Sequence, residues 1–131
     1  MARKKRDGKL ILIVEDEGNI SKFLAFRLRQ AGFVVEIADD GEKGLNLIRQ
    51  IRPDLIILDL MLPHLPGGEV CKAVREDDDE EIAKIPIIML TANASDVDRI
   101  VGKVIGANYY MTKPFDFSDV LENIQQTIGM S

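Results

Sequence analysis

Short apolar runs alternate along the chain with longer stretches in which apolar residues recur every three or four positions. Five of the runs have the length of β-strands, and they lie at residues 10–14, 33–38, 55–58, 86–90 and 108–112. The periodic stretches have the spacing of amphipathic helices, and they lie near residues 20–31, 45–51, 70–74, 97–105 and 116–128. Strand and helix therefore alternate five times along the sequence.

This alternation predicts a parallel sheet with right-handed crossovers, because a helix must carry the chain back before each new parallel strand. The run Leu10–Val14 is apolar throughout, which is typical of a central strand covered on both faces. We expect an α/β fold of the flavodoxin-like type, a doubly wound five-stranded parallel sheet in order 2-1-3-4-5 with five helices. Local signals for the helix ends are a turn and cap at Asp39–Gly41, a cap at Asp116, and stops at Gly32, Pro53 and Gly129.

Length and composition narrow the class of protein. The 131 residues suit one domain, which we place at residues 9–129 after a flexible basic tail at residues 1–8. The net charge of -5 and the pI near 4.9 argue against direct nucleic-acid binding through general electrostatics. No apolar run approaches the length of a membrane span, so we expect a cytoplasmic protein without membrane contact.

The chain holds one cysteine, Cys71, and one histidine, His64. A single thiol cannot form an internal disulfide, and a Cys/His zinc site needs more ligands than these two. We interpret Cys71 as a small helix residue packed on the sheet and His64 as an exposed loop residue.

Polar side chains follow four of the predicted strands at the point where each strand ends. Glu15 and Asp16 follow the first strand, Asp59 the third, Thr91 the fourth and Lys113 the fifth. Ligands of open parallel sheets bind outside the carboxyl ends of the strands, so we expect these groups to share one rim. Three carboxylates so close together repel one another, and a hard divalent cation such as Mg²⁺ prefers such oxygen ligands.

The predicted rim has the parts needed to receive a phosphoryl group. Asp59 is a nucleophile beside a metal site, and the charge on the phosphoryl oxygens could be met by the metal, the Lys113 ammonium and the Thr91 hydroxyl. We therefore predict Mg²⁺-dependent phosphorylation of Asp59.

Four segments resemble the signature of the response-regulator receiver family, and each stands at a strand end. They are Leu12–Glu17, Asp59–Pro63, Leu90–Ala92 and Tyr110–Phe115. The resemblance covers roughly residues 9–128. In one departure, Asn108–Tyr109 replaces the acidic pair that is usual before the switch aromatic of the family.

The resemblance implies a role for each residue of the rim. Asp59 would attack a phosphohistidine and form an aspartyl phosphate. Asp16 would bind Mg²⁺ directly, Glu15 mainly through water, and the carbonyl of Met61 would be a further ligand. Lys113 would pair with the phosphoryl group, and its bond to Pro114 is expected to be cis.

The resemblance also implies a switch. Thr91 would move toward the phosphoryl group and bond one of its oxygens, and Tyr110 would swing inward behind it. This would change the face made by the helix near residues 97–105, the strand near 108–112 and the last helix. Tyr109 stands directly before Tyr110, and we favour Tyr110 as the switch because of its spacing from Lys113.

The implied partners are a sensor histidine kinase or a phosphotransfer protein, and a downstream output protein or domain. A phosphorylation-dependent homodimer is a further implied assembly. The chain would not be an enzyme in the usual sense, because it would catalyse only its own phosphorylation and dephosphorylation.

Simpler structural readings stand beside these roles. Thr91 could cap the following helix unless Asn93 or Ser95 does so, and Tyr110 on an edge strand could serve packing alone. The acidic run at residues 76–81 is most simply a solvated helix end or loop.

Three other classes of protein compete with a phosphoacceptor. A phosphatase with an aspartate nucleophile would need a second acid where this chain has Met61, and a flavodoxin-like carrier would need a Ser/Thr/Gly loop where residues 15–18 read Glu-Asp-Glu-Gly. The nearest alternative is a receiver-like interaction module excised from a larger regulator or hybrid kinase. A module that only binds partners would normally lack one of Asp59, Asp16 and Lys113, and all three are present. The residues do not separate a stand-alone regulator from a receiver domain of a longer protein.

Overall fold

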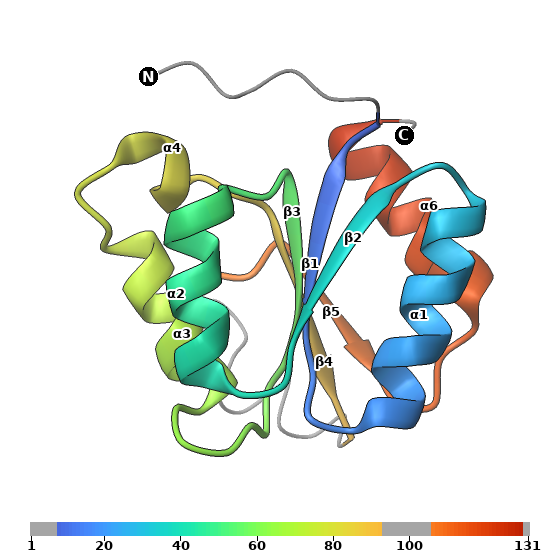
Figure 1. The fold of residues 1–131 in the computed structure, drawn as a ribbon, viewed down its shortest axis with the longest axis horizontal. Helices are drawn as coiled ribbons and strands as arrows, with labels where there is room; N and C mark the ends of the chain where they lie inside the picture. Colours follow the sequence, from blue (N-terminus) through green and yellow to red (C-terminus); the bar gives the residue numbers. More distant parts are fainter. Residues whose placement is uncertain (1–7, 93–105, 130–131) are drawn as a thin grey trace.

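The computed structural model describes residues 8–92 and 106–129, and in it a five-stranded sheet lies between two layers of helices (Figure 1). All neighbouring strands are parallel, and the strand order is β2-β1-β3-β4-β5. The strands are β1 (Leu10–Val14), β2 (Val34–Ala38), β3 (Leu55–Asp59), β4 (Ile87–Thr91) and β5 (Tyr109–Thr112). The predicted doubly wound sheet and its order are therefore confirmed.

The helices of the described ranges cover both faces of the sheet. They are α1 (Gly18–Gln30), α2 (Gly41–Ile51), α3 (Gly67–Arg75), α4 (Glu80–Ala83) and α6 (Phe117–Ile128). Helices α1 and α6 lie on one face, and α2, α3 and α4 lie on the other (Figure 1). The helix predicted near residues 97–105, the cap candidates Asn93 and Ser95, and most of the predicted tail lie outside the described residues.

The core consists of one apolar layer on each face of the sheet. Every residue of β1, β3 and β4 is buried, whereas the edge strands β2 and β5 are only partly buried. Side chains alternate between faces along a strand, so Leu12 packs with α2 and α3 while Ile13 packs with α1 and α6. This burial on both faces explains why the central strands read as continuous apolar runs.

Local chemistry explains both ends of α2. The side chain of Asp40 accepts a hydrogen bond from the amide of Lys43 at 2.8 Å and caps α2, as predicted. Helix α2 ends before Pro53 with Arg52 in a left-handed conformation, φ 47°. Asp116 does occupy the cap position of α6, but its side chain makes no capping bond, so this part of the prediction was wrong.

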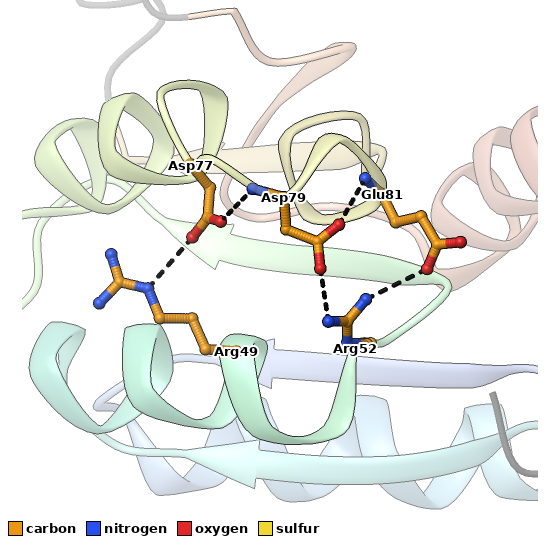
Figure 2. A network of polar contacts seen from close by, with 5 residues as sticks. All are labelled: Arg49, Arg52, Asp77, Asp79 and Glu81. Carbon is orange, nitrogen blue, oxygen red and sulfur yellow. Dashed lines mark hydrogen bonds and ion pairs between the residues drawn. The ribbon is translucent and has the colours of Figure 1, made fainter. Parts of the chain in front are cut away.

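The acidic run at residues 76–81 lies at the end of α3 and the start of α4 and is largely exposed, which confirms the interpretation as a solvated helix end or loop. Some of its carboxylates also make specific contacts. The side chain of Asp79 caps the short helix α4 through the amide of Glu81 at 2.9 Å. Arg49 pairs with Asp77 at 3.2 Å, and Arg52 pairs with both Asp79 and Glu81 (Figure 2). The run therefore joins α4 to the end of α2, a contact that no local pattern in the sequence indicates.

Arg75, at the end of α3, connects this helix to the segments that precede β4 and β5. Its guanidinium donates to the carbonyl oxygens of Ala83 at 2.9 Å and Ile85 at 2.8 Å, ahead of β4. It also donates to the carbonyl of Gly106 at 2.9 Å and to Asn108 Oδ1 at 3.0 Å, ahead of β5. The planar guanidinium offers five donors in a fixed geometry, so one side chain joins α3 to the starts of two strands.

Candidate functional site

The rim at the carboxyl ends of the strands gathers the polar residues that the sequence placed there. The register pairs Val14 with Leu58, so the residues that follow these two, Glu15 and Asp59, begin side by side. The same register logic sets Thr91 opposite Thr112, the residue before Lys113. Parallel pairing alone therefore brings four separate segments to one edge.

Three carboxylates at this rim lie close enough to share one ion. Glu15, Asp16 and Asp59 each offer a ligand atom, and these atoms all lie within 4.8 Å of one another. Glu15 and Asp59 are buried, with 1% and 4% of their surface exposed, whereas Asp16 is exposed. The group is therefore half enclosed and still open to solvent through Asp16.

The donor set fits a hard divalent cation. Within residues 8–92 and 106–129, Glu15 Oε1 is buried and has no hydrogen-bond partner of good geometry, and it forms an ion pair with Lys113 Nζ at 2.9 Å. Buried carboxylate oxygens are normally satisfied by donors or by a metal. Three carboxylates in a small space, all oxygen ligands, are the chemistry that Mg²⁺ or Ca²⁺ prefers.

Lys113 brings its ammonium into the same group. Its Nζ lies 2.9 Å from Glu15 Oε1, 3.3 Å from Glu17 Oε1 and 3.5 Å from Asp59 Oδ2. The bond from Lys113 to Pro114 is cis, as predicted. Burial alone would lower the pKa of Lys113, but the carboxylates of Glu15, Asp59 and Glu17 outweigh it and raise that pKa.

Asp59 is held in an environment that disfavours its charge. Its pKa is raised from 3.8 to about 7, chiefly by burial and then by the negative charge of Glu15. Lys113 and the amide of Met61, which lies 3.3 Å from Asp59 Oδ1, lower it in part. An added cation would favour the ionised carboxylate, which is the form that acts as a nucleophile.

Thr91 is joined to the site through its backbone. It is buried at the end of β4, and its carbonyl accepts a hydrogen bond from the amide of Lys113 at 2.8 Å. Next to it, the carbonyl of Leu90 accepts from the amide of Leu60 at 2.8 Å, directly after Asp59. Thr91 therefore stands between the segments that carry the nucleophile and the lysine.

Tyr109 and Tyr110 lie on opposite faces of the sheet. Tyr109 packs with the layer under α1 and α6, and Tyr110 packs with the layer under α2 and α3. Tyr110 pairs with Met89, two residues before Thr91, and residues two apart on a strand share a face. Tyr110 and Thr91 are thus on the same side of the sheet, which a coupled movement requires, and burial raises the pKa of Tyr110.

The loop after Asp59 depends on a glycine whose role the sequence analysis missed. A Cβ at Gly67 would lie 2.0 Å from the carbonyl oxygen of Asp59, so the first residue of α3 must be glycine to pass this close. The amide of Gly67 donates to the carbonyl of Leu60 at 3.0 Å. The Met61 side chain, by contrast, points outward and is 70% exposed, which leaves a role for its carbonyl as a prediction.

The structure confirms the interpretation of Cys71 as a packed helix residue and of His64 as an exposed loop residue. Cys71 is buried in the layer under α2 and α3, and burial raises the pKa of its thiol to about 11. His64 is exposed in the loop, with a left-handed backbone at φ 69°. None of the helices in the described ranges combines the length and apolar character that a membrane span requires.

Comparison with known proteins gives the class to which this fold and rim belong. The family model of the response regulator receiver domain matches residues 11–125. The chain therefore belongs to that family and is a receiver domain of the two-component response-regulator type.

Individual relatives agree with the family. The chain is 44% identical over 118 residues to the probable transcriptional regulator ycf27 of Guillardia theta, covering 90% of this chain and 44% of that protein. It is 45% identical over 115 residues to the DNA-binding dual master transcriptional regulator RpaA of Synechocystis sp., covering 88% of this chain and 47% of that protein. The chain thus spans less than half the length of these two relatives.

Among solved structures, the receiver domain of the sensor histidine kinase PA1611 from Pseudomonas aeruginosa is similar. It superimposes with a TM-score of 0.84 at 31% identity, over 93% of this chain and 98% of that one. That structure contains a magnesium ion coordinated in its active-site cleft.

Proposed function

We propose that this receiver domain accepts a phosphoryl group on Asp59 in a reaction that depends on Mg²⁺. The observation that carries the proposal is that two carboxylates and one ammonium group surround a single buried aspartate. Asp59 lies within 4.8 Å, measured between ligand atoms, of Glu15 and Asp16, and its Oδ2 lies 3.5 Å from Lys113 Nζ. A nucleophile, a metal site and a fixed ammonium are the parts that phosphoryl transfer needs.

Glu15, Asp16 and Asp59 would hold Mg²⁺, with the carbonyl of Met61 as a further ligand. When bound, the ion supplies positive charge that offsets the repulsion among the carboxylates and the charge on the phosphoryl oxygens. The receiver domain of PA1611, whose structure contains magnesium in its cleft, supports this assignment.

The residues of the chain would do the rest of the chemistry. An Oδ atom of Asp59 attacks phosphorus, and the bond from phosphorus to the leaving group breaks. That leaving group is a histidine nitrogen of a partner or the acetate of acetyl phosphate, and it departs with the electron pair. Lys113 stabilises the charge on the phosphoryl oxygens, and the hydroxyl of Thr91 donates a hydrogen bond to one of them.

Thr91 and Tyr110 would carry the signal away from the site. Movement of Thr91 toward the phosphoryl group would open space on its own face of the sheet, and Tyr110 shares that face. The proposal rests on this shared face and on the hydrogen bond from the amide of Lys113 to the carbonyl of Thr91.

The proposed partners follow from the family. A sensor histidine kinase or phosphotransfer protein would donate the phosphoryl group, and an output protein or domain would receive the signal. RpaA is described as a DNA-binding transcriptional regulator more than twice as long as the matched region, so a DNA-binding output would lie in a part of a protein beyond this domain. A phosphorylated homodimer and a cytoplasmic site of action remain predictions.

The proposal can be tested by intact-mass measurement after incubation with acetyl phosphate and Mg²⁺. We expect one phosphoryl adduct on the wild-type protein and on Asp78→Asn, an exposed aspartate outside the rim. Asp59→Asn and a wild-type sample with EDTA should gain none. An unmodified wild type, or an equal adduct on Asp59→Asn, would contradict the proposal.

The switch can be tested separately with beryllofluoride, a mimic of the phosphoryl group. Amide chemical shifts should change at Asp59, at Thr91 and at Tyr110 when beryllofluoride and Mg²⁺ are added together. If only the amides beside Asp59 move, the assignment of Thr91 and Tyr110 is wrong while phosphorylation of Asp59 still stands.

A further inference from the structure

Lys113 is shared by three carboxylates, and one of them has no role in the proposed chemistry. Glu15 and Asp59 are buried and belong to the metal group. Glu17 is different, because its side chain is 62% exposed and its Oε1 accepts a hydrogen bond from Lys113 Nζ at 3.3 Å. It lies outside the set of ligand atoms that could hold a metal in the described ranges.

The backbone of Glu17 is fixed while its side chain is directed to Lys113. Its amide donates to Glu15 Oε2 at 3.1 Å, and its carbonyl accepts from the amides of Ile20 at 3.0 Å and Ser21 at 3.1 Å. Glu17 occupies the cap position of α1, yet its side chain makes no capping bond. A shorter Asp, Asn or Ser would cap this helix better, so helix capping does not explain a glutamate here.

We propose that Glu17 is a positioning residue that acts through Lys113. In the unphosphorylated domain it competes with Asp59 for the ammonium, and it must release that ammonium before Lys113 can pair fully with a phosphoryl group. The inference rests on the proposed phosphorylation of Asp59. It adds a residue that limits the rate of phosphoryl uptake and lies outside the nucleophile, the metal ligands and the switch.

The expected direction of the change in phosphorylation rate follows from the charges at the rim. An incoming phosphodonor is an anion, and Glu17 adds one negative charge at the open side of the rim while holding part of the hydrogen-bonding capacity of Lys113. Because Glu17 is largely exposed, solvent screens it, and we expect its neutralisation to raise the rate by only about two- to fivefold. Glu15 Oε1 lies 2.9 Å from Lys113 Nζ in the wild type, so we expect this ion pair to keep the ammonium at the rim in Glu17→Gln.

The kinetic test compares phosphorylation by acetyl phosphate at saturating Mg²⁺ in three proteins. Saturation removes any change in metal affinity from the comparison. Glu17→Gln should react about two- to fivefold faster than wild type. The matched control is Glu36→Gln, which removes the same charge from an exposed position in the middle of β2 and should react like wild type. An unchanged or slower Glu17→Gln, or an equal gain in Glu36→Gln, overturns the proposal.

A second measurement does not depend on phosphorylation. Urea unfolding of wild type, Glu17→Gln, Lys113→Met and the double variant, all in EDTA, gives the coupling between the two side chains. If Glu17 holds Lys113, the effects of the two single substitutions should not add, and the coupling should change the unfolding constant by at least about twofold. Additive effects would overturn the proposal, because a residue that served only α1 would not be coupled to Lys113. If the wild type takes up no phosphoryl group, the function proposed for Asp59 fails, and this cycle still decides whether Glu17 holds Lys113.

Discussion

Replacement of Asp59 by asparagine should stabilise the metal-free protein at and above neutral pH. The wild-type carboxylate is buried beside Glu15, and both features raise its pKa to about 7. Asparagine keeps the shape of the side chain and a carbonyl oxygen that can accept from the amide of Met61. It removes the charge that the fold disfavours when no cation is bound.

The size of the expected gain in the free energy of unfolding follows from the pKa of Asp59. Raising it from 3.8 to about 7 corresponds to at most about 4 kcal/mol, at about 1.4 kcal/mol per pKa unit. Solvent near the open rim reduces the effect, so we expect a gain of about 2 kcal/mol in the free energy of unfolding at about pH 8.5. Because the folded pKa of Asp59 is raised, the wild type incurs no penalty for this carboxyl group below pH 3.8. It loses stability progressively as the pH rises from 3.8, and the loss is complete above about pH 7. The gain should therefore be about half as large near pH 5.5.

The assay is urea unfolding in EDTA at these two pH values. The control is Asp78→Asn, which removes an exposed carboxylate away from the rim and should change the free energy of unfolding by less than about 0.5 kcal/mol. Addition of Mg²⁺ should make the wild type more stable than Asp59→Asn, because Mg²⁺ binding to the folded wild type stabilises it by about 2.7 kcal/mol at a hundredfold excess over Kd. A metal-free Asp59→Asn that is less stable than wild type at about pH 8.5 would refute the reasoning.

Three further predictions concern contacts around the rim and the opposite end of the sheet. Gly67→Ala should lower the free energy of unfolding by about 2 kcal/mol or more and slow phosphorylation in the intact-mass assay, because its Cβ would lie 2.0 Å from the carbonyl oxygen of Asp59. Arg75→Met should cost about 2–4 kcal/mol in urea unfolding, because it leaves several carbonyl oxygens without their donor; a loss below 1 kcal/mol would show that water replaces it. Arg52→Ala should cost less than about 1 kcal/mol, and the loss should shrink in high salt, because its ion pairs with Asp79 and Glu81 lie at the surface (Figure 2).

The sequence was sufficient for the sheet and for most of the rim. Continuous apolar runs predict central parallel strands because burial on both faces excludes polar residues from them. The groups at their carboxyl ends must then meet, because parallel strands end at one edge. Asp59, Glu15 and Lys113 were found in this way, and the structure places Lys113 Nζ within 3.5 Å of both carboxylates.

Contacts between distant segments were beyond the reach of sequence patterns. Asn108 departs from the family pattern, yet its Oδ1 accepts from both Arg75 at 3.0 Å and the amide of Ile87 at 2.8 Å. The acidic run at residues 76–81 looked like a solvated segment because charge runs usually are, and only the position of α2 shows that part of it is paired.

The sequence by itself determined the alternation of strands and helices, the burial of the central strands and the residue types at the rim. These depend on periodicity and on local polarity, which each segment carries on its own. The tertiary structure decided which carboxylates share Lys113, which tyrosine lies on the face of Thr91, and why Gly67 must be glycine. Those features depend on distances of a few ångströms between segments far apart in the chain, and such distances exist only after the sheet has paired and the helices have packed.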